Sequence, residues 1–214
     1  MKSYKFLQLT AQRASSDAQI WIVGCSFAHG IGVKSHERFG KLISDNLNIP
    51  VSFLTQGGTS IEWAADQILR ADIQPGDIVI WGLTGASRFS YLDETDVLNH
   101  VRIENFDQIK NLHTVIDKNL LVSNHMIYKA ITCIEQVRHY LDTRLCKFVL
   151  AVLPTNISAH DLQILEYTST LKHAILLFDT NNYSFIDYGT DNLHPGPKHN
   201  KWYAEQILTH LGKL

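Results

Sequence analysis

Five short apolar runs, separated by helix-length segments, constrain the fold of this chain more than any other feature. The runs are rich in β-branched and aromatic residues: QIWIVG (19–24), PVSFLT (50–55), DIVIWG (77–82), KFVLAVL (147–153) and HAILLFD (173–179). Nearly continuous apolar runs of this length are typical of strands that are buried on both faces, as in a parallel sheet. The sequence therefore predicts a five-stranded parallel sheet.

The segments between and after these runs predict helices. Five segments are candidates: 36–48, 60–71, 124–145, 158–171 and 197–214. Apolar residues recur at helical spacing in the first two, and Pro197 falls in the first turn of the last, where proline is tolerated. Alternation of strands and helices along the chain predicts an α/β fold, a flavodoxin-like three-layer α/β/α sandwich with right-handed crossovers.

The length of 214 residues suits one domain with a large core, so we expect residues 1–214 to form a single domain. The segment from about 89 to 122 has weaker periodicity and many polar residues. We expect it to be an insertion, such as a lid, at the functional edge of the sheet. Ligands of open parallel sheets bind outside the carboxyl ends of the strands, so residues that directly follow a strand are the first functional candidates.

Composition excludes several classes of protein. Hydrophobic residues make up 45% and charged residues 19%, which indicates a folded globular chain. The formal net charge of −2 and the absence of long runs of like charge argue against a nucleic-acid partner. No run is long enough for a membrane span, and the first residues lack the uninterrupted apolar core of a signal peptide. We therefore expect a cytoplasmic protein.

Ser26 is the first candidate catalytic residue. It follows the first predicted strand in GCSFAHGIGV (24–33), where Gly24 permits a sharp turn and a glycine-containing loop comes next. A hydroxyl placed there lies at the carboxyl end of the strand, near backbone N–H groups that could stabilise an anion. The alternative is that Ser26 only caps a helix or closes a turn.

Asp191 and His194 form the second candidate pair, in the loop TDNLHPGPKHN (190–200) before the last helix. A spacing of three residues can place both side chains on one side of a helical turn. The carboxylate would then bind one imidazole nitrogen and leave the other for a hydroxyl, which is the logic of a catalytic triad. The alternative is that both residues only cap and solvate a Pro/Gly loop.

Together these two blocks resemble the SGNH (GDSL-like) hydrolase family. In that family a glycine-x-serine motif ends the first strand and an Asp-x-x-His-Pro motif precedes the last helix, and both are present here. The resemblance spans almost the whole chain. It implies that Ser26 is the nucleophile, His194 its general base and Asp191 the residue that orients the imidazole.

The resemblance also implies an oxyanion hole. One donor is the N–H of Ser26, and another is the N–H of a glycine after the second strand, for which Gly58 is favoured over Gly57 in TQGGTSI (55–61). Both glycines could also serve only as conformational enablers. The family places an asparagine after the third strand, but Thr84 occupies that position in WGLTGASRF (81–89). Loss of one such donor lowers the rate about a hundred- to a thousandfold.

Two further residues near these motifs have alternative interpretations. Arg88 is a candidate substrate-binding residue that could supply positive charge at the site, but an exposed loop position is the ordinary expectation for arginine. Cys25 stands where many family members have aspartate, and it could be a rival nucleophile. We disfavour this role, since neighbours on a strand point to opposite faces and cysteine is most often buried.

Other chemistries have little support in the sequence. The first motif approximates the nucleophile elbow of α/β-hydrolases, but only about 25 residues precede it, and that fold places several strands before the elbow. It also lacks the spacing of nucleotide-binding loops. Asp191, His194 and His199, with His29 and His36 more remote, form the best metal-ligand group, but no metal-binding signature occurs. The three cysteines make no disulfide framework or paired zinc site. We expect no metal and no cofactor.

The sequence thus predicts a serine ester hydrolase that works through an acyl-enzyme. By resemblance, its substrate is a small acyl ester, for example of an O-acetylated carbohydrate. Two alternatives remain open. One is a catalytically impaired domain that binds a glycan or a protein, motivated by the departures at Cys25 and Thr84, and the other is an O-acyltransferase on the same fold. The oligomeric state is left open.

Overall fold

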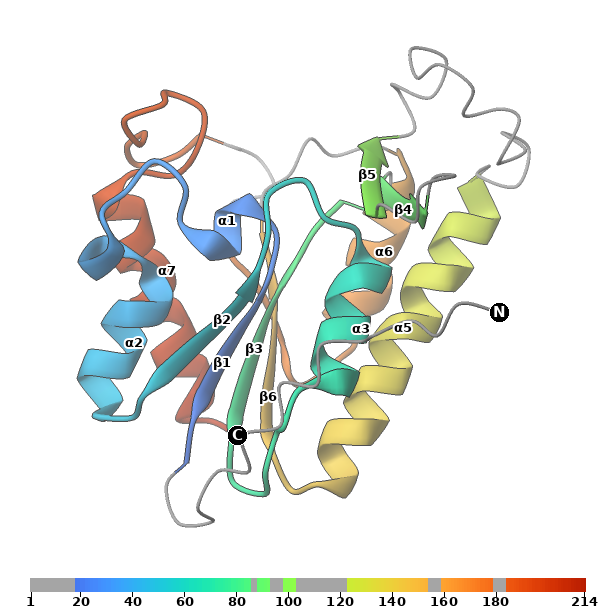
Figure 1. Cartoon of the computed structure of the whole chain (residues 1–214), viewed down its shortest axis with the longest axis horizontal. Helices are drawn as coiled ribbons and strands as arrows, with labels where there is room; N and C mark the ends of the chain where they lie inside the picture. The colour runs from blue at the N-terminus through green and yellow to red at the C-terminus, as the bar shows by residue number, and fades with distance from the viewer. Residues whose placement is uncertain (1–17, 86–87, 93–97, 103–122, 154–158, 179–183) are drawn as a thin grey trace.

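The centre of the structure is a five-stranded parallel sheet (Figure 1). The computed structural model describes residues 18–85, 88–92, 98–102, 123–153, 159–178 and 184–214. The sheet strands are β1 (Ile20–Gly24), β2 (Val51–Thr55), β3 (Ile78–Leu83), β6 (Lys147–Val152) and β7 (Ala174–Leu176). Their order is β2-β1-β3-β6-β7, which is the flavodoxin-like order. The predicted five-stranded parallel sheet is confirmed.

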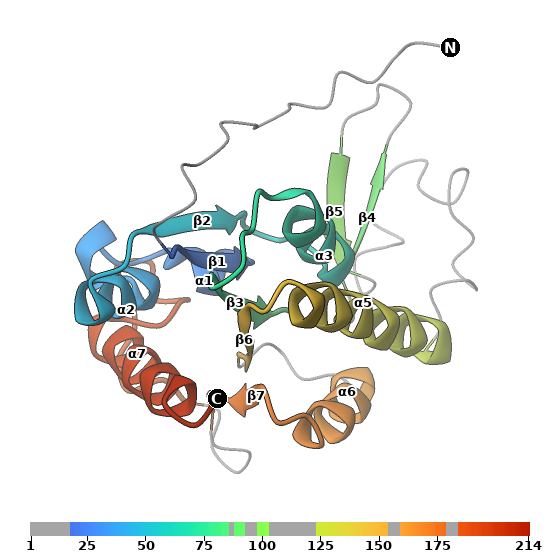
Figure 2. The same cartoon turned by 90° about the horizontal axis from the view of Figure 1, so that it is seen from below.

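Helices cover both faces of the sheet (Figure 2). One face carries α2 (Phe39–Leu47) and α7 (Pro197–Leu211), and the other carries α3 (Ile61–Arg70), α5 (Ser123–Thr143) and α6 (Ala159–Ser169). Successive strand residues alternate between the two layers of core: Ile22 and Ile80 pack toward α2 and α7, whereas Val23 and Trp81 pack toward α3 and α5. Both faces of the central strands β1, β3 and β6 are buried, which explains their continuous apolar sequences, whereas the edge strands β2 and β7 are half-buried.

Two predicted elements differ from the structure. The predicted helix 36–48 is divided into a short 3-10 turn, η1 (Ser35–Glu37), and α2, because Arg38 between them has an extended backbone. The last strand, predicted over 173–179, contains only Ala174–Leu176, which pair with β6. None of the helices in the described ranges is long and apolar enough to cross a membrane.

A small antiparallel hairpin stands apart from the main sheet. It consists of β4 (Arg88–Leu92) and β5 (Leu98–Arg102), and so begins one residue before the segment of about 89–122 that we expected to be an insertion. The hairpin lies against α3, where Ser60 and Ser90 form a hydrogen bond of 2.8 Å between their hydroxyl oxygens. Residues 93–97 and 103–122 lie outside the described part of the chain. The role of this segment as a lid, and the single domain over 1–214, stay predictions.

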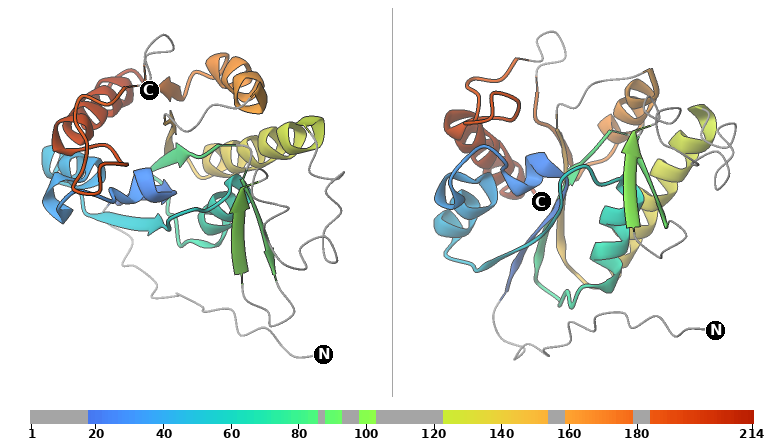
Figure 3. Two further views of the ribbon diagram at one scale, coloured as in Figure 1. Left: turned by 90° about the horizontal axis from the view of Figure 1, so that it is seen from above. Right: turned by 45° about the horizontal axis from the view of Figure 1, so that its top comes forward.

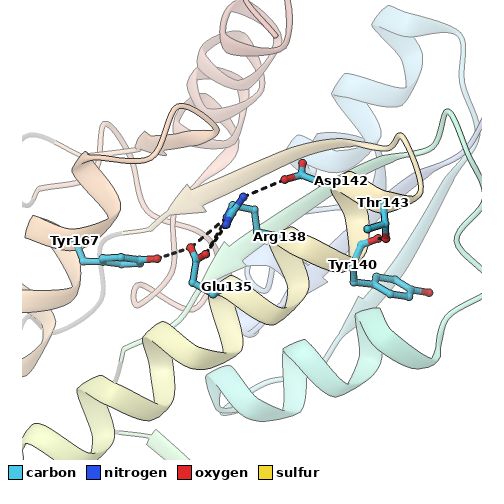
Figure 4. Close-up of polar contacts among 6 residues, drawn as sticks. All are labelled: Glu135, Arg138, Tyr140, Asp142, Thr143 and Tyr167. Atoms are coloured by element: carbon cyan, nitrogen blue, oxygen red, sulfur yellow. Dashed lines mark hydrogen bonds and ion pairs between the residues drawn. The ribbon is translucent and has the colours of Figure 1, made fainter.

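A polar network joins α5 to α6 (Figure 4). Arg138 donates to both carboxylate oxygens of Glu135, at 3.2 and 3.1 Å from Nε and 2.5 Å from Nη2, and Tyr167 on α6 donates to the same carboxylate. Hydrogen bonds from Arg138 and then Tyr167 lower the pKa of Glu135, while burial and the bond to Glu135 raise the pKa of Tyr167 to about 12. The network holds α6 beside α5 at the edge of the sheet.

The close approach of α2 to the sheet gives a testable prediction at Gly40. A methyl group there would lie 2.6 Å from Cγ1 of Ile22 and 3.0 Å from Cε1 of Phe53. Alanine favours a helix by about 1 kcal/mol over glycine, but overpacking a core costs about 1–3 kcal/mol. We therefore expect Gly40→Ala to lower the free energy of unfolding, measured in urea. Asn46→Ala, at an exposed position of α2, is the control, and equal stability of Gly40→Ala and the wild type would contradict this packing.

Candidate active site

The first half of the candidate site is the turn from β1 into the short helix α1 (Ser26–His29). β1 ends at Gly24, whose φ of 139° favours glycine, and a Cβ at this position would lie 2.5 Å from the carbonyl oxygen of Gly82. Ser26 is the first residue of α1 and is 7% exposed. Helix α1 begins where the sequence led us to expect a loop. Ser26 therefore lies at the carboxyl end of a central strand.

Cys25 occupies the position between the strand and α1. The argument from alternating strand faces does not apply to it, because β1 already ends at Gly24 and Cys25 is the N-cap residue of α1. Its side chain is fully buried. A buried thiol of this kind behaves as a small hydrophobic group, so burial gives the reason to disfavour Cys25 as the nucleophile.

The second half of the candidate site is the pair Asp191 and His194. Nδ1 of His194 lies 2.6 Å from Oδ2 of Asp191, and Oδ1 of Asp191 accepts hydrogen bonds from the backbone N–H groups of Leu193 (3.0 Å) and His194 (3.1 Å). Burial alone would raise the pKa of Asp191, but these hydrogen bonds lower it to about 2. The carboxylate is therefore ionised at neutral pH and orients the imidazole, with Nε2 on the opposite side of the ring.

Backbone contacts bring the two halves together (Figure 3). The N–H of Thr190 donates to the carbonyl oxygen of Gly32 at 2.8 Å, and a Cβ on Gly32 would lie 3.0 Å from Oδ1 of Asp191. The ring of Phe27, next to Ser26, contacts the His194 ring edge-on, with 5.3 Å between the centroids. Larger side chains at Gly32 would separate the loop after α1 from the loop of His194.

The Ser26 hydroxyl and the His194 imidazole are not joined by a hydrogen bond, although Phe27, the residue after Ser26, contacts the His194 ring. Within the described part of the chain, no hydrogen bond links Oγ of Ser26 to His194. Such bonds are often long in unliganded enzymes and tighten only when substrate is bound. The geometry therefore provides an imidazole oriented by Asp191 on the loop that contacts the segment after Ser26, without the closed triad of a substrate complex.

Two supporting residues were missed by the sequence analysis. Asp187 accepts hydrogen bonds from the N–H groups of Lys198 (3.0 Å) and His199 (2.8 Å), and so satisfies the first turn of α7. Asn200 donates from Nδ2 to the carbonyl oxygens of Pro195 and Gly196, both at 3.0 Å, and its Oδ1 accepts from the N–H of Phe39. The sequence signal that could have indicated both residues is the presence of Asp and Asn on either side of the Pro-Gly-Pro turn. Both residues hold the His194 loop against α2 and α7.

Of the two oxyanion-hole glycines, Gly57 lies closer to the serine. A Cβ on Gly57 would be 3.9 Å from Cβ of Ser26, whereas one on Gly58 would have no atom within 4 Å. Gly58 has a φ of 81° and provides the turn between β2 and α3. Gly57 is therefore the glycine of the two that lies next to Ser26, and the choice of N–H donor between Gly57 and Gly58 stays a prediction.

Thr84 reaches the same edge of the sheet as Ser26. Gly24 pairs with Gly82 in adjacent parallel strands, and Ser26 and Thr84 each follow by two residues. Thr84 is 4% exposed, and its Oγ1 is buried without a hydrogen-bond partner among the described residues. A buried unpartnered hydroxyl is costly, so this oxygen is available to a bound group.

Arg88 corrects one expectation from the sequence. We expected an exposed loop residue, but Arg88 begins β4 and is only 5% exposed. The chain turns back at Gly85, whose carbonyl oxygen accepts from the N–H of Arg88, and then enters the hairpin that lies against α3. Nη1 of Arg88 is buried and has no partner within the described ranges. The hairpin, which apolar periodicity does not reveal, buries this arginine.

Two of the histidines considered as metal ligands, His199 and His29, have other partners. Nδ1 of His199 accepts from the N–H of Ile186 at 3.1 Å, and burial lowers the pKa of His199 to about 4. Nδ1 of His29 lies 2.7 Å from Oγ1 of Thr55. Over the residues described, no group of three or more His, Cys, Asp and Glu side chains could hold a metal ion.

Comparisons by sequence give no family for this chain. No protein-family model matches it, and no curated protein matches it either. Comparisons of structure do find proteins of similar fold.

Three solved structures illustrate the similarity. A carbohydrate esterase, described as having divergent catalytic and non-catalytic binding functions in its active site, has a TM-score of 0.59 and 14% identity, over 92% of this chain and 69% of that one. TesA has a TM-score of 0.58 and 11% identity, over 91% and 98%. A putative lipolytic protein of the G-D-S-L family from Desulfitobacterium hafniense has a TM-score of 0.56 and 12% identity, over 91% and 99%. The chain thus has the SGNH hydrolase fold that its two motifs indicated, shared with G-D-S-L lipolytic proteins and carbohydrate esterases.

Proposed function

We propose that the chain is a serine ester hydrolase, with Ser26 as nucleophile, His194 as general base and Asp191 as the residue that orients the base. The observation that carries this proposal is the 2.6 Å contact between Asp191 and His194, held by backbone contacts beside the turn that bears Ser26. An oriented imidazole next to a hydroxyl at the carboxyl end of a strand is the arrangement that activates a serine.

The proposed reaction has two halves. Nε2 of His194 removes the proton from Ser26 as its Oγ attacks the ester carbonyl, and the N–H groups of Ser26 and Gly57 stabilise the oxyanion, with the Thr84 hydroxyl as a third donor. His194 then protonates the departing alcohol, which leaves an acyl-enzyme. In the second half His194 activates a water molecule, which attacks the acyl group, and Ser26 leaves with its proton restored.

A small acyl ester, for example an O-acetylated carbohydrate, is the proposed substrate. Carbohydrate esterases among the proteins of similar fold support this class. Two observations are also compatible with the alternative of a binding domain with impaired catalysis. Thr84 stands in place of asparagine, and no hydrogen bond joins Ser26 to His194 among the described residues. Measurement of the released acid distinguishes the three functions. Hydrolysis produces a free acid, whereas a binding domain leaves the ester intact and acyl transfer forms a new ester with a second alcohol.

The direct test is hydrolysis of p-nitrophenyl acetate by variants of the proposed triad. Ser26→Ala and His194→Gln should each lower kcat/KM by about a thousandfold or more, because the pair acts as a unit. His139→Gln makes the same substitution at an exposed histidine of α5 and should keep the wild-type rate. Equal rates in Ser26→Ala and the wild type would sink the proposal.

Asp191 should affect both the rate and the pH dependence of stability. With a pKa of about 2, Asp191 stays ionised above pH 4, so Asp191→Asn should lower kcat/KM about a thousandfold across pH 5–9. Its pKa in the fold lies below the ordinary value of 3.8, so its contribution to stability is complete above about pH 4 and is lost as the pH falls toward 2. The Tm difference between wild type and Asp191→Asn should therefore shrink between pH 4 and 2. A difference that stays constant would contradict this ionic role.

Thr84 can be tested as an oxyanion donor by Thr84→Val, which removes the hydroxyl and keeps the shape. We expect kcat to fall about tenfold or more, while stability stays the same or rises, because Oγ1 has no partner among the described residues. Thr168→Val on α6 is the matched control: it is fully buried, and its hydroxyl donates to the carbonyl oxygen of Leu165. That control should lose about 1 kcal/mol of stability and keep its rate. An unchanged kcat in Thr84→Val would exclude the donor role.

A further inference from the structure

Three buried polar atoms without partners belong to residues that directly follow β3 or form the hairpin β4–β5. Among the described residues, Oγ1 of Thr84, Nη1 of Arg88 and Nε2 of His100 are buried and make no hydrogen bond. Buried polar groups are nearly always satisfied, so an exception is a candidate to bind another group. Eleven such atoms occur among the described residues, and these three are on residues that β3 and the hairpin connect, which favours one common partner.

These residues come from adjoining elements. Thr84 follows β3, and the chain turns at Gly85, which accepts a hydrogen bond from the N–H of Arg88 at 3.3 Å. In the antiparallel hairpin, Ser90 pairs with His100, so Arg88, two residues before Ser90, shares their face. That face lies against the start of α3, where Ser60 contacts Ser90 and the ring of Trp63 contacts that of His100.

The chain provides hydrogen-bond donors at this place. The hydroxyls of Ser60 and Ser90 are 2.8 Å apart, and that of Ser90 is 2.7 Å from Nδ1 of His100. When Ser60 donates to Ser90 and Ser90 donates to Nδ1 of His100, Nδ1 is an acceptor, and the proton of the neutral imidazole is on Nε2. Burial, and then the charge of Arg88, lower the pKa of His100, so the ring is neutral. Arg88 offers only donors, and the Thr84 hydroxyl can donate as well.

The positive charge of Arg88 has no counter-ion in the described part of the chain. Arg88 is 5% exposed, and within those residues no carboxylate pairs with it. The acidic residue in the first turn of α3, Glu62, pairs instead with Lys129 on α5. Arginine stays charged in proteins, and a buried charge without a partner is strongly unfavourable. A bound anion would satisfy this guanidinium.

We infer that Arg88, with Thr84 and His100, binds a carboxylate on the substrate, so that the enzyme prefers esters of acidic compounds such as acidic sugars. This inference rests on the proposed function, because it assigns the substrate class of that site. A carboxylate has two oxygens and accepts several hydrogen bonds, and arginine binds it in a planar, two-pronged fashion. The location next to Thr84 places this carboxylate close to the scissile ester.

The test uses two matched pairs of esters. One pair carries the carboxylate on the acyl part (4-nitrophenyl hemisuccinate and its methyl ester), and the other on the alcohol part (4-acetoxybenzoate and its methyl ester). In at least one pair, the wild type should favour the carboxylate by about tenfold or more in kcat/KM, mainly through KM. Arg88→Met should abolish the preference and keep hydrolysis of the neutral ester. Arg70→Met, at an exposed arginine near the end of α3, should behave like the wild type.

Two outcomes would overturn the inference. One is the absence of a preference in both pairs. The other is an equal loss with the charged and the neutral ester in Arg88→Met, because Arg88 would then stabilise the reacting oxygen. Removal of an unpaired buried charge should not lower the Tm of Arg88→Met. If this variant does not fold, Arg88→Lys decides, and a preference unchanged from the wild type would contradict binding by the guanidinium.

Binding separates this inference from the proposed function. Ser26→Ala should bind each ester without hydrolysing it, and isothermal titration should show about tenfold tighter binding of the carboxylate in the preferred pair. Adding Arg88→Met to Ser26→Ala should remove the difference. If the wild type hydrolyses no ester but the binding preference is present, the proposed function fails and the carboxylate site stands. Equal affinity for the charged and the neutral ester in both pairs would contradict the proposed carboxylate site.

Discussion

The contact between the loop after α1 and the loop before α7 is the interaction on which the proposed site depends. Residues 158 positions apart in the chain meet there, where the backbone and the hydroxyl of Thr190 both donate to the carbonyl oxygen of Gly32. Gly189 and Gly32 have no side chains to separate the two backbones. The loop of Asp191 and His194 is therefore held against the segment that directly follows α1, the short helix that begins with Ser26. Neither loop alone could activate a hydroxyl.

The parallel sheet provides the frame for this contact. β1 and β3 are adjacent and in register, so that the chain leaves both strands at one edge and presents Ser26 and Thr84 there. Helices on both faces bury the strands and fix the positions of their ends. Asp187 and Asn200 then hold the His194 loop to the start of α7. The proposed chemistry needs each of these layers, although only a few residues would touch the substrate.

The sequence predicted the sheet well because helices cover both of its faces, which makes the central strands continuous apolar runs. It also predicted the pairing of Asp191 with His194, since their short spacing confines them to one turn. It did not predict the burial of Arg88. That burial comes from packing of a polar hairpin against α3, and such a contact leaves no periodic apolar signal. Likewise, the choice between Gly57 and Gly58 depends on where the β2–α3 turn passes Ser26, which spacing alone cannot decide.

Covalent trapping of the nucleophile tests the central claim most directly. A fluorophosphonate reacts with a serine only where a base and an oxyanion hole activate it. The wild-type protein should gain the mass of one phosphonyl group, located on Ser26 by peptide mass spectrometry, and the reaction should be slowed strongly in Asp191→Asn. Unlabelled Ser26, or equal labelling rates in wild type and Asp191→Asn, would contradict a nucleophile activated by the Asp191–His194 pair.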